Sequence, residues 1–289
     1  MLYICIPSFD EAPTVGVLLW KIRTVFQEYS REFEILVYND ASTDATAETL
    51  ESYRKVLPLT VIAGERRIGY GRALIELCRA AAQRTRYARR DAVITLQADF
   101  TDQPEFIPEM VRRFEGGADI VIAESEAKSL EPKPVRQLRR AAPWVLRWFV
   151  KTPGVADPFG SFRLYRVSVL RDALRAAGDT PLISADGWAA NVDLLLATTP
   201  HARRVEVLTI APRYDLRPRE SRVKPFADAV NLYRFGRAAR HRASSAAYAA
   251  PAAFVAATAP AASVAATAPA ASVAATAPAA PAGPPTARS

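Results

Sequence analysis

The sequence predicts an α/β fold in which a mostly parallel, Rossmann-like sheet is covered by helices on both faces. Five short apolar runs lie within the first 125 residues, and segments with the apolar spacing of helices separate them. The connections between these segments are short, as in strand–helix–strand units. Five such alternations indicate a sheet whose two faces are both buried.

The expected strands are the apolar runs at residues 2–6, 34–38, 59–63, 92–96 and 118–123. The expected helices occupy residues 14–26, a segment through residue 50, residues 71–85 and residues 104–114. Residues that favour helix starts support two of them. Pro13 suits the first turn of the first helix, and Ser42-Thr43-Asp44 offers side-chain caps to the second.

After residue 125 the pattern changes, and we expect residues 126–242 to form a smaller lobe packed on residues 1–125. Residues 132–150 are basic and then aromatic. Further elements of this lobe are expected at residues 162–165, 187–197 and 204–210.

Residues 243–289 are predicted to form a disordered tail. A nine-residue repeat begins at Val255 as Val-Ala-Ala-Thr-Ala-Pro-Ala-Ala-Ser and returns from Val264 and Val273. A repeat with so little large apolar surface cannot build a packed core, and its proline interrupts a helix. We therefore expect this tail to be dispensable for folding.

Composition restricts the class of protein without identifying it. The net charge of +8 suits an anionic partner, although a generally arginine-rich composition would also produce it. The two cysteines, Cys5 and Cys78, provide neither a disulfide framework nor a zinc site, and we expect buried reduced thiols. No run approaches the roughly 18 to 20 apolar residues of a membrane span. Without a signal peptide either, a cytoplasmic protein is expected.

Three acidic clusters follow three of the predicted strands. They are Asp10-Glu11, residues 40–44 and residues 99–102. Each cluster alone could be a solvated turn, but ligands bind at the carboxyl ends of parallel strands, so three clusters there indicate one site. Gly69-Tyr70-Gly71 precedes a predicted helix and could either hold a phosphate or form a plain turn. It lacks the full dinucleotide-binding fingerprint.

These motifs resemble those of family 2 glycosyltransferases. Ile6-Pro7-Ser8-Phe9-Asp10-Glu11 is similar to the family's opening Pro-Thr-Tyr-Asn-Glu signature, and residues 37–44 are similar to its Asp-Asp-Gly-Ser-Thr-Asp segment. Leu96-Gln97-Ala98-Asp99-Phe100 lies where the family carries its Asp-x-Asp motif. The resemblance implies a GT-A fold and a nucleotide-diphosphate sugar as donor.

Later motifs resemble one group within that family, the polyprenol-phosphate sugar transferases typified by dolichol-phosphate mannosyltransferase. Residues 157–166 are similar to the group's Ser-Gly-Phe-Arg-Leu-Tyr segment, and residues 219–222 to its Gly-Glu-Ser-Lys element. The resemblance covers about residues 2–235 and implies transfer to a polyprenyl phosphate at the cytoplasmic membrane face. It makes residues 1–125 the nucleotide-sugar half and residues 126–242 the acceptor half.

The resemblance also assigns residues to the site. The nucleotide-sugar ligands would be Pro7, Phe9, Glu11, Asn39, Asp40, Gln97 and Asp99. Asp99 and Gln97 would hold the Mg²⁺ or Mn²⁺ that bridges the donor diphosphate. The acceptor phosphate would contact Arg163, Ser221 and Arg222, and the catalytic residues would be Asp99, Arg163 and Arg222.

The sequence departs from the family pattern at several places. Gln97 replaces the first aspartate of Asp-x-Asp, Asn39 replaces an aspartate, Asp10 replaces an asparagine, and Gly160-Ser161 inverts the usual order. Thr101 stands where relatives in the polyprenol group often carry glutamine. A neutral amide in place of a carboxylate could weaken or alter metal use.

Two other functions stay open. A family 2 transferase acting on a polysaccharide, a protein or a small molecule would need a carboxylate base, for which Asp186 and Asp193 are available. A non-catalytic nucleotide-sugar-binding protein is supported by Gln97 alone. His201 and His241 lie away from the acidic clusters, which argues against a Ser-His-Asp hydrolase. No nucleic-acid-binding motif accompanies the positive charge, so no nucleic-acid partner is expected.

Two basic segments predict contact with an anionic membrane surface. Between residues 136 and 149, arginines alternate with Trp144, Trp148 and Phe149, and residues 224–242 place aromatic and basic side chains at helical spacing. Such segments suit the headgroup region, which predicts a peripheral protein. Alternatively, both could pack their aromatic residues on the core.

Overall fold

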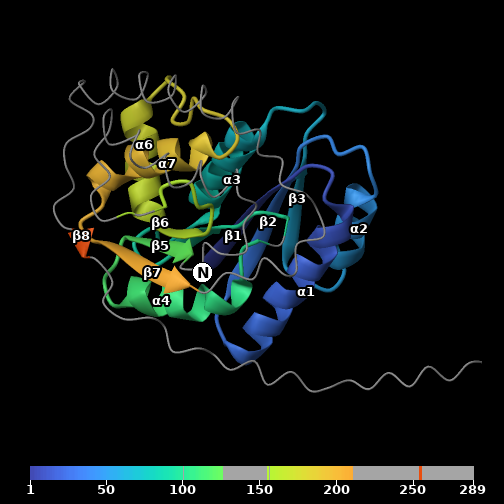
Figure 1. The fold of residues 1–289 in the computed structure, drawn as a ribbon, viewed down its shortest axis with the longest axis horizontal. Helices are drawn as coiled ribbons and strands as arrows, with labels where there is room; N and C mark the ends of the chain where they lie inside the picture. Colours follow the sequence, from blue (N-terminus) through green and yellow to red (C-terminus); the bar gives the residue numbers. More distant parts are fainter. Residues whose placement is uncertain (100, 126–154, 156, 211–253, 256–289) are drawn as a thin grey trace, which may run out of the picture.

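The computed structural model describes residues 1–99, 101–125, 155, 157–210 and 254–255 (Figure 1). They build one eight-stranded sheet with the strand order β3-β2-β1-β4-β6-β5-β7-β8. The strands are β1 (Leu2–Ser8), β2 (Phe33–Asn39), β3 (Leu59–Ala63), β4 (Ala92–Thr95), β5 (Ile120–Ser125), β6 (Arg163–Arg166), β7 (Val205–Ile210) and β8 (Phe254–Val255). The predicted α/β class and the five N-terminal strands are confirmed.

Helices cover both faces of the sheet (Figure 1). They are α1 (Ala12–Glu28), α2 (Thr46–Arg54), α3 (Tyr70–Arg84), α4 (Ile107–Glu115), α6 (Val167–Ala177) and α7 (Ala189–Thr198), with short 3₁₀ helices η1 (Pro104–Phe106) and η2 (Thr199–His201). Side chains of β1 alternate between two apolar clusters. Ile4 packs in the cluster that contains α1 and α4, and Cys5 in the cluster that contains α3, α6 and α7.

Most strand pairs are parallel, as predicted. Strand β1 pairs in parallel with β2 and β4, and β5 pairs in parallel with β7. Strand β6 is the exception, because it runs antiparallel to both β4 and β5. The described strands of residues 126–242 belong to the same sheet, with Leu164 of β6 packed in one apolar cluster and Tyr165 in the other.

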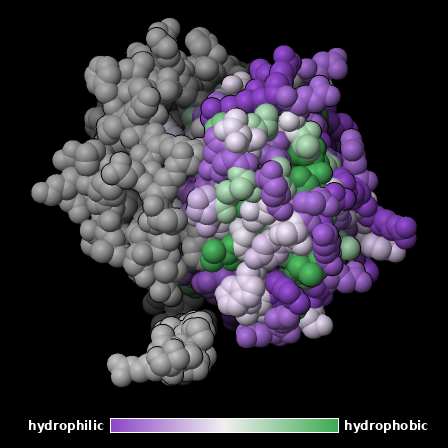
Figure 2. Space-filling model, turned by 90° about the vertical axis from the view of Figure 1, so that its right-hand side faces the viewer, coloured by the Kyte–Doolittle hydropathy of each residue, from purple (hydrophilic) through white to green (hydrophobic). Residues whose placement is uncertain are grey.

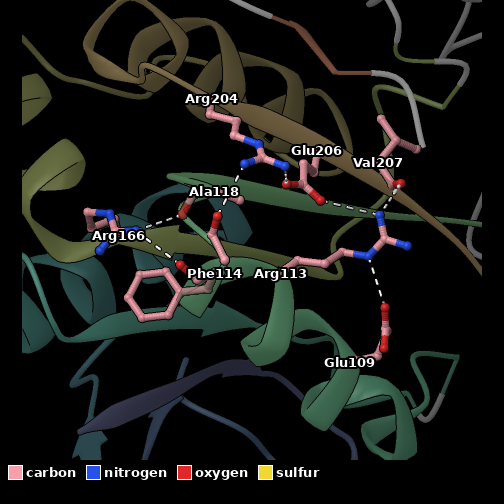
Figure 3. A network of polar contacts seen from close by, with 9 residues as sticks. Glu109, Arg113, Phe114, Ala118, Arg166, Arg204, Glu206 and Val207 are labelled. Atoms are coloured by element: carbon pink, nitrogen blue, oxygen red, sulfur yellow. Dashed lines mark hydrogen bonds and ion pairs between the residues drawn. The ribbon is translucent and has the colours of Figure 1, made fainter. Parts of the chain in front are cut away.

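A network of charged groups fastens α4 to the amino-terminal ends of β5 and β7 (Figure 3). The Arg113 guanidinium lies 3.1 Å from the Glu109 carboxylate and 3.4 Å from that of Glu206. Arg204 lies 2.7 Å from the same Glu206 carboxylate. Arg166 donates a 2.8 Å hydrogen bond to the Ala118 carbonyl. The network lies at the opposite end of these strands from the acidic clusters.

The face that carries α1 and α2 has no broad apolar surface among the described residues. Figure 2 shows small hydrophobic areas separated by hydrophilic ones on this side. The large apolar side chains that are exposed include Val17 and Trp20 of α1 and Val56, with 49%, 54% and 55% exposure. Isolated apolar residues of this kind are normal on protein surfaces.

Two expectations concern segments that the structure describes only in part or not at all. Within the predicted tail, Phe254–Val255 pair in parallel with Val205 and Glu206 of β7, so these two residues extend the sheet. The rest of the tail and both basic segments, at residues 136–149 and 224–242, lie outside the described residues. In the part of the chain that is described, no helix combines the length and the apolar character needed to span a membrane.

The prediction of two buried reduced thiols is confirmed. Cys5 and Cys78 are both free and fully buried. Burial raises the pKa of Cys78 to about 12 and raises that of Cys5 well above its usual value. Neither group forms a thiolate near neutral pH, which makes both poor nucleophiles.

Candidate active site

The strand register brings the three acidic clusters to one edge of the sheet, as predicted. Ser8 at the end of β1 lies beside Asn39 at the end of β2, and Cys5 lies beside Thr95 at the end of β4. The segments that follow these strands therefore emerge together. The β4 ladder ends at Cys5, two residues before Pro7, so the missing N–H of Pro7 breaks no described pairing with β4.

Several carboxylates of this edge hold loop backbones in place. The Asp10 carboxylate accepts a 2.7 Å hydrogen bond from the Thr43 N–H, and the Asp44 carboxylate accepts one of 3.1 Å from the Ala12 N–H. The Glu11 N–H donates to the Thr46 hydroxyl at 2.9 Å. These three bonds cross between the loops after β1 and β2. Asp10 adopts a φ of +50°, which the crossing bonds stabilise against its steric cost.

The ionisation of Asp44 reflects this role. Burial alone would raise the pKa of its carboxyl group, but hydrogen bonds from the Thr46 side chain and from the Ala12 and Thr46 N–H groups outweigh burial. The pKa is therefore lower than the usual 3.8, and Asp44 is charged throughout the physiological range.

Asp40 organises the neighbouring loop. Its two carboxylate oxygens accept hydrogen bonds from the Ile68 N–H at 2.6 Å and the Gly69 N–H at 2.9 Å, and its side chain is almost fully buried. Asn39 accepts a hydrogen bond of 3.1 Å from the Ser42 N–H. Both residues lie at the predicted edge, and both shape its backbone.

Gly69 and Gly71, at the start of α3, allow this part of the backbone to lie close to residues 185–186. The Gly71 N–H donates to the Asp186 carboxylate at 3.0 Å, and a Cβ on Gly71 would lie 2.3 Å from the Ala185 carbonyl oxygen. Gly69 has a φ of +91°, which other residues rarely adopt. Because Asp40 and Asp186 accept from these amides, the structure favours a structural turn over a phosphate-binding loop.

Phe9 presents a half-buried ring at the same edge, and Arg67 covers it. The guanidinium carbon of Arg67 lies 3.9 Å from the ring centroid, a cation–π arrangement. Glu11, at the start of α1, accepts a 3.1 Å hydrogen bond from the Thr14 hydroxyl. Arg67 was not predicted as a site residue, although the arginine pair Arg66-Arg67 near Gly69 was a signal in the sequence that could have revealed it.

Asp99 lies in the turn after β4, where the family motif predicts a metal ligand. One of its oxygens accepts hydrogen bonds from the N–H and the hydroxyl of Thr101, at 3.1 and 2.6 Å. The described residues contain no group of three or more His, Cys, Asp or Glu side chains arranged for a metal. Mg²⁺ is often held by one or two carboxylates together with substrate phosphates. Asp99 and the Gln97 amide fit such a sparse set of oxygen ligands.

Arg163 lies in the core, a position that does not favour its predicted contact with an acceptor phosphate. It is 1% exposed, and its guanidinium donates to the backbone carbonyls of Asn191 and Pro158. The reason is the position of β6 in the middle of the sheet, which directs its side chains into the two core layers. Arg163 is thus a core residue in this structure, with no exposed guanidinium for an acceptor phosphate. The other two acceptor candidates, Ser221 and Arg222, lie outside the described residues.

A second set of polar residues behind the site was not predicted. The Tyr70 hydroxyl donates to the Asn191 side chain at 2.9 Å, and the Asn191 amide donates to the Phe159 carbonyl at 3.0 Å. Burial, with the negative charge of Asp102, raises the pKa of Tyr70 well above its usual value. Polar residues within the apolar run of α7 were the signal in the sequence that could have revealed Asn191.

The two carboxylates considered as bases differ in exposure. Asp193 is fully buried and accepts hydrogen bonds from the N–H groups of Ser184 and Ala185, at 2.8 and 3.2 Å. Asp186 is exposed beside the start of α3. Of this pair, Asp186 alone can meet a solvent-borne acceptor in the present conformation.

Comparisons with known proteins agree with these features. The model of Glycosyl transferase family 2 matches residues 3–174, more than half of the chain. The chain is 29% identical over 170 residues to the bactoprenol glucosyl transferase of Shigella phage SfV, covering 58% of this chain and 52% of that protein. It is 28% identical, with the same coverage, to a prophage bactoprenol glucosyl transferase homolog of Escherichia coli K12. The chain thus spans about half the length of the curated relatives it matches.

Solved structures share the fold at low sequence identity. Glucosyl-3-phosphoglycerate synthase from Mycobacterium tuberculosis, in complex with Mn²⁺, uridine diphosphate and phosphoglyceric acid, gives a TM-score of 0.57 at 18% identity. That likeness covers 81% of this chain and 75% of the synthase. S. aureus TarS 1–349 in complex with UDP-GlcNAc gives a TM-score of 0.51 at 16% identity, covering 82% and 66%. The predicted GT-A fold is confirmed by these likenesses.

Proposed function

The chain belongs to glycosyl transferase family 2, and we propose that it transfers a sugar from a nucleotide-diphosphate sugar to a polyprenyl phosphate. The observation that carries this proposal is the single sheet edge from which the segments with Phe9, Asp40 and Asp99 emerge. In the proposed arrangement, the Phe9 ring with Arg67 is an apolar and cationic wall for the nucleotide. Pro7, Glu11 and Asn39 complete the donor side.

Asp99 and Gln97 are proposed to hold Mg²⁺ or Mn²⁺ against the donor diphosphate. When bound, the cation neutralises the charge that develops on the leaving nucleoside diphosphate. Asp99 is suited to this because its hydrogen bonds from Thr101 fix the carboxylate before any ligand arrives. A carboxylate oriented in advance loses little freedom on binding.

The polyprenyl phosphate acceptor is supported by the relatives, which are named as bactoprenol glucosyl transferases. A phosphate oxygen is already anionic, so it can attack the anomeric carbon without a strong base. Because Arg163 is buried, the acceptor phosphate is proposed to contact Ser221 and Arg222. Contact with an anionic membrane surface at the cytoplasmic face belongs to the same proposal.

A different acceptor is the second candidate, and Asp186 is the observation that favours it. A hydroxyl acceptor needs a base, and Asp186 is an exposed carboxylate beside the glycine turn. Asp186→Asn separates the two candidates. Loss of about 100-fold or more in kcat would indicate a hydroxyl acceptor, because general-base catalysis contributes about 10²–10⁴-fold. Transfer to a phosphate would continue.

The proposal is tested by transfer of radiolabelled sugar into butanol-extractable lipid. Purified protein is incubated with UDP-glucose or GDP-mannose, Mn²⁺ and vesicles that contain polyprenyl phosphate. Asp99→Asn should remove most of the transfer, whereas the control Asp119→Asn, at the far end of the sheet, should retain it. Wild-type turnover by Asp99→Asn at limiting Mn²⁺, or no transfer to lipid from any donor, would overturn the proposal. A chain that binds donor but transfers to nothing would be the non-catalytic binding protein.

A further inference from the structure

One carboxylate joins the turn that carries Asp99 to a loop on the other side of β4. A single oxygen of Asp102 accepts the Gln97 N–H at 2.8 Å and the Ser161 hydroxyl at 2.7 Å. The first bond closes the turn formed by residues 97–102. The second crosses to the loop formed by residues 157–161, which enters β6.

The bond from Gln97 restrains the chain near Asp99. Residues 97 and 102 lie on either side of Asp99 in the sequence, so the bond between them limits how far the two ends of this segment can move apart. Asp99 itself is fastened to Thr101 within this segment. Loss of the Asp102 carboxylate would therefore remove this restraint.

The loop of residues 157–161 is held by several elements, so it can act as a fixed support. The Asp157 N–H donates to the Glu124 carboxylate at the end of β5, at 3.1 Å. Asn191 of α7 donates to the Phe159 carbonyl at 3.0 Å. Ser161 is 4% exposed, and its carbonyl accepts the Thr95 hydroxyl of β4. A bond to a support of this kind restrains the turn more than a bond to a surface loop would.

We propose that Asp102 and Ser161 are positioning residues that couple the Asp99 turn to the 157–161 loop. Metal-dependent donor binding at Asp99 then depends on a hydroxyl that touches neither metal nor donor. This inference rests on the proposed role of Asp99. It also explains Ser161, which stands where the related group carries glycine, because glycine offers no hydroxyl to Asp102.

The test measures Mn²⁺ binding to UDP-loaded protein by calorimetry, which does not require turnover. Asp102→Ala removes the acceptor of both bonds and should weaken Mn²⁺ binding by about 10- to 100-fold, the usual effect of losing a group that orients a metal ligand. Asp102→Asn keeps a carbonyl oxygen and should recover part of this loss. Ser161→Ala removes one hydrogen bond but leaves the Asp102 carboxylate in place, and should weaken binding by about 2- to 10-fold. UDP binding in EDTA should stay within about twofold, the scatter expected for a site left otherwise intact.

A thermodynamic cycle and a matched control separate coupling from general damage. The Asp102→Ala/Ser161→Ala double variant should bind Mn²⁺ no more weakly than Asp102→Ala, because both act through one bond. Asp119→Ala is the control, since its carboxylate also accepts a backbone N–H and a side chain, but at the other end of β5. It should lower the melting temperature and leave Mn²⁺ binding unchanged. If Asp102→Ala does not fold, Ser161→Ala and Asp102→Asn still decide the matter.

The outcomes distinguish a failure of the proposed coupling from a failure of the proposed metal site at Asp99. If Asp99→Asn abolishes Mn²⁺ binding while the Asp102 and Ser161 variants bind as wild type, the coupling is refuted and the metal site stands. Additive losses in the double variant, or an equal loss in Asp119→Ala, also refute the coupling. If Asp99→Asn itself binds Mn²⁺ normally, the proposed metal site falls, and the coupling falls with it.

Discussion

Replacing Arg163 by alanine should lower the free energy of unfolding rather than weaken acceptor binding. The guanidinium donates to two buried backbone carbonyls, those of Asn191 and Pro158, and lies 3.4 Å from the Tyr165 hydroxyl. A hydrogen bond from a charged group contributes about 1.5–3 kcal/mol. Loss of the two carbonyl bonds alone therefore predicts about 3–6 kcal/mol, before the cavity left by the side chain.

For a domain of this size, 1 kcal/mol lowers the melting temperature by about 2–4 °C. The expected fall for Arg163→Ala is therefore about 6–24 °C, measured by thermal unfolding and checked by urea denaturation. Arg79→Ala is the control, because Arg79 is 44% exposed in a surface pair with Glu76. That variant should stay within about 0.5 kcal/mol of wild type. Wild-type stability of Arg163→Ala, with a large rise in the acceptor KM, would refute the core assignment and restore the phosphate role.

Four further predictions follow from the site and the sheet edge. Arg67→Ala should weaken UDP binding by about 3- to 10-fold through loss of the Phe9 contact, while its neighbour Arg66→Ala should not, in the same calorimetric titration. The low pKa of Asp44 stabilises the fold above pH 3.8, and this contribution is lost as pH falls through the folded-state pKa. Asp44→Asn should therefore lose less stability than wild type between pH 6 and the acid range. Gln97→Asp should keep or tighten Mn²⁺ binding, because a carboxylate is the stronger ligand. Deleting residues 243–289 removes β8 and should lower the melting temperature by no more than about 4 °C.

The sequence was sufficient to predict the strands and helices whose apolar pattern lies within a short stretch of the chain. Apolar runs of strand length and the helical spacing between them predicted β1 to β5, because both patterns reflect burial of neighbouring residues. It was insufficient for β6, whose antiparallel place between β4 and β5 depends on pairing with residues 41 to 74 positions earlier in the chain. A four-residue strand carries no sign of its partners in its own composition.

The candidate site likewise divides into local features that the sequence revealed and long-range contacts that it did not. The turn containing Asp99 was found because motif and strand end coincide. The burial of Arg163 was not predicted, because a motif preserves residue type without revealing which side of the chain is buried. The bond that Asp102 accepts from the Ser161 hydroxyl was also invisible, since it joins a turn to a loop 59 residues later.

The acidic residues of the sheet edge contribute in two different ways, and this supports the proposal that one aspartate serves where the family motif has two. Asp10, Asp40, Asp44 and Asp102 accept backbone N–H groups, and these bonds balance much of their charge. They fix the loops, so the donor and the cation need not order them on binding. A preorganised site requires fewer ligand contacts for the same affinity, because less conformational freedom is lost. The neutral Gln97 also avoids another negative charge beside Asp99 and Asp102, where like charges would repel each other until a cation arrives.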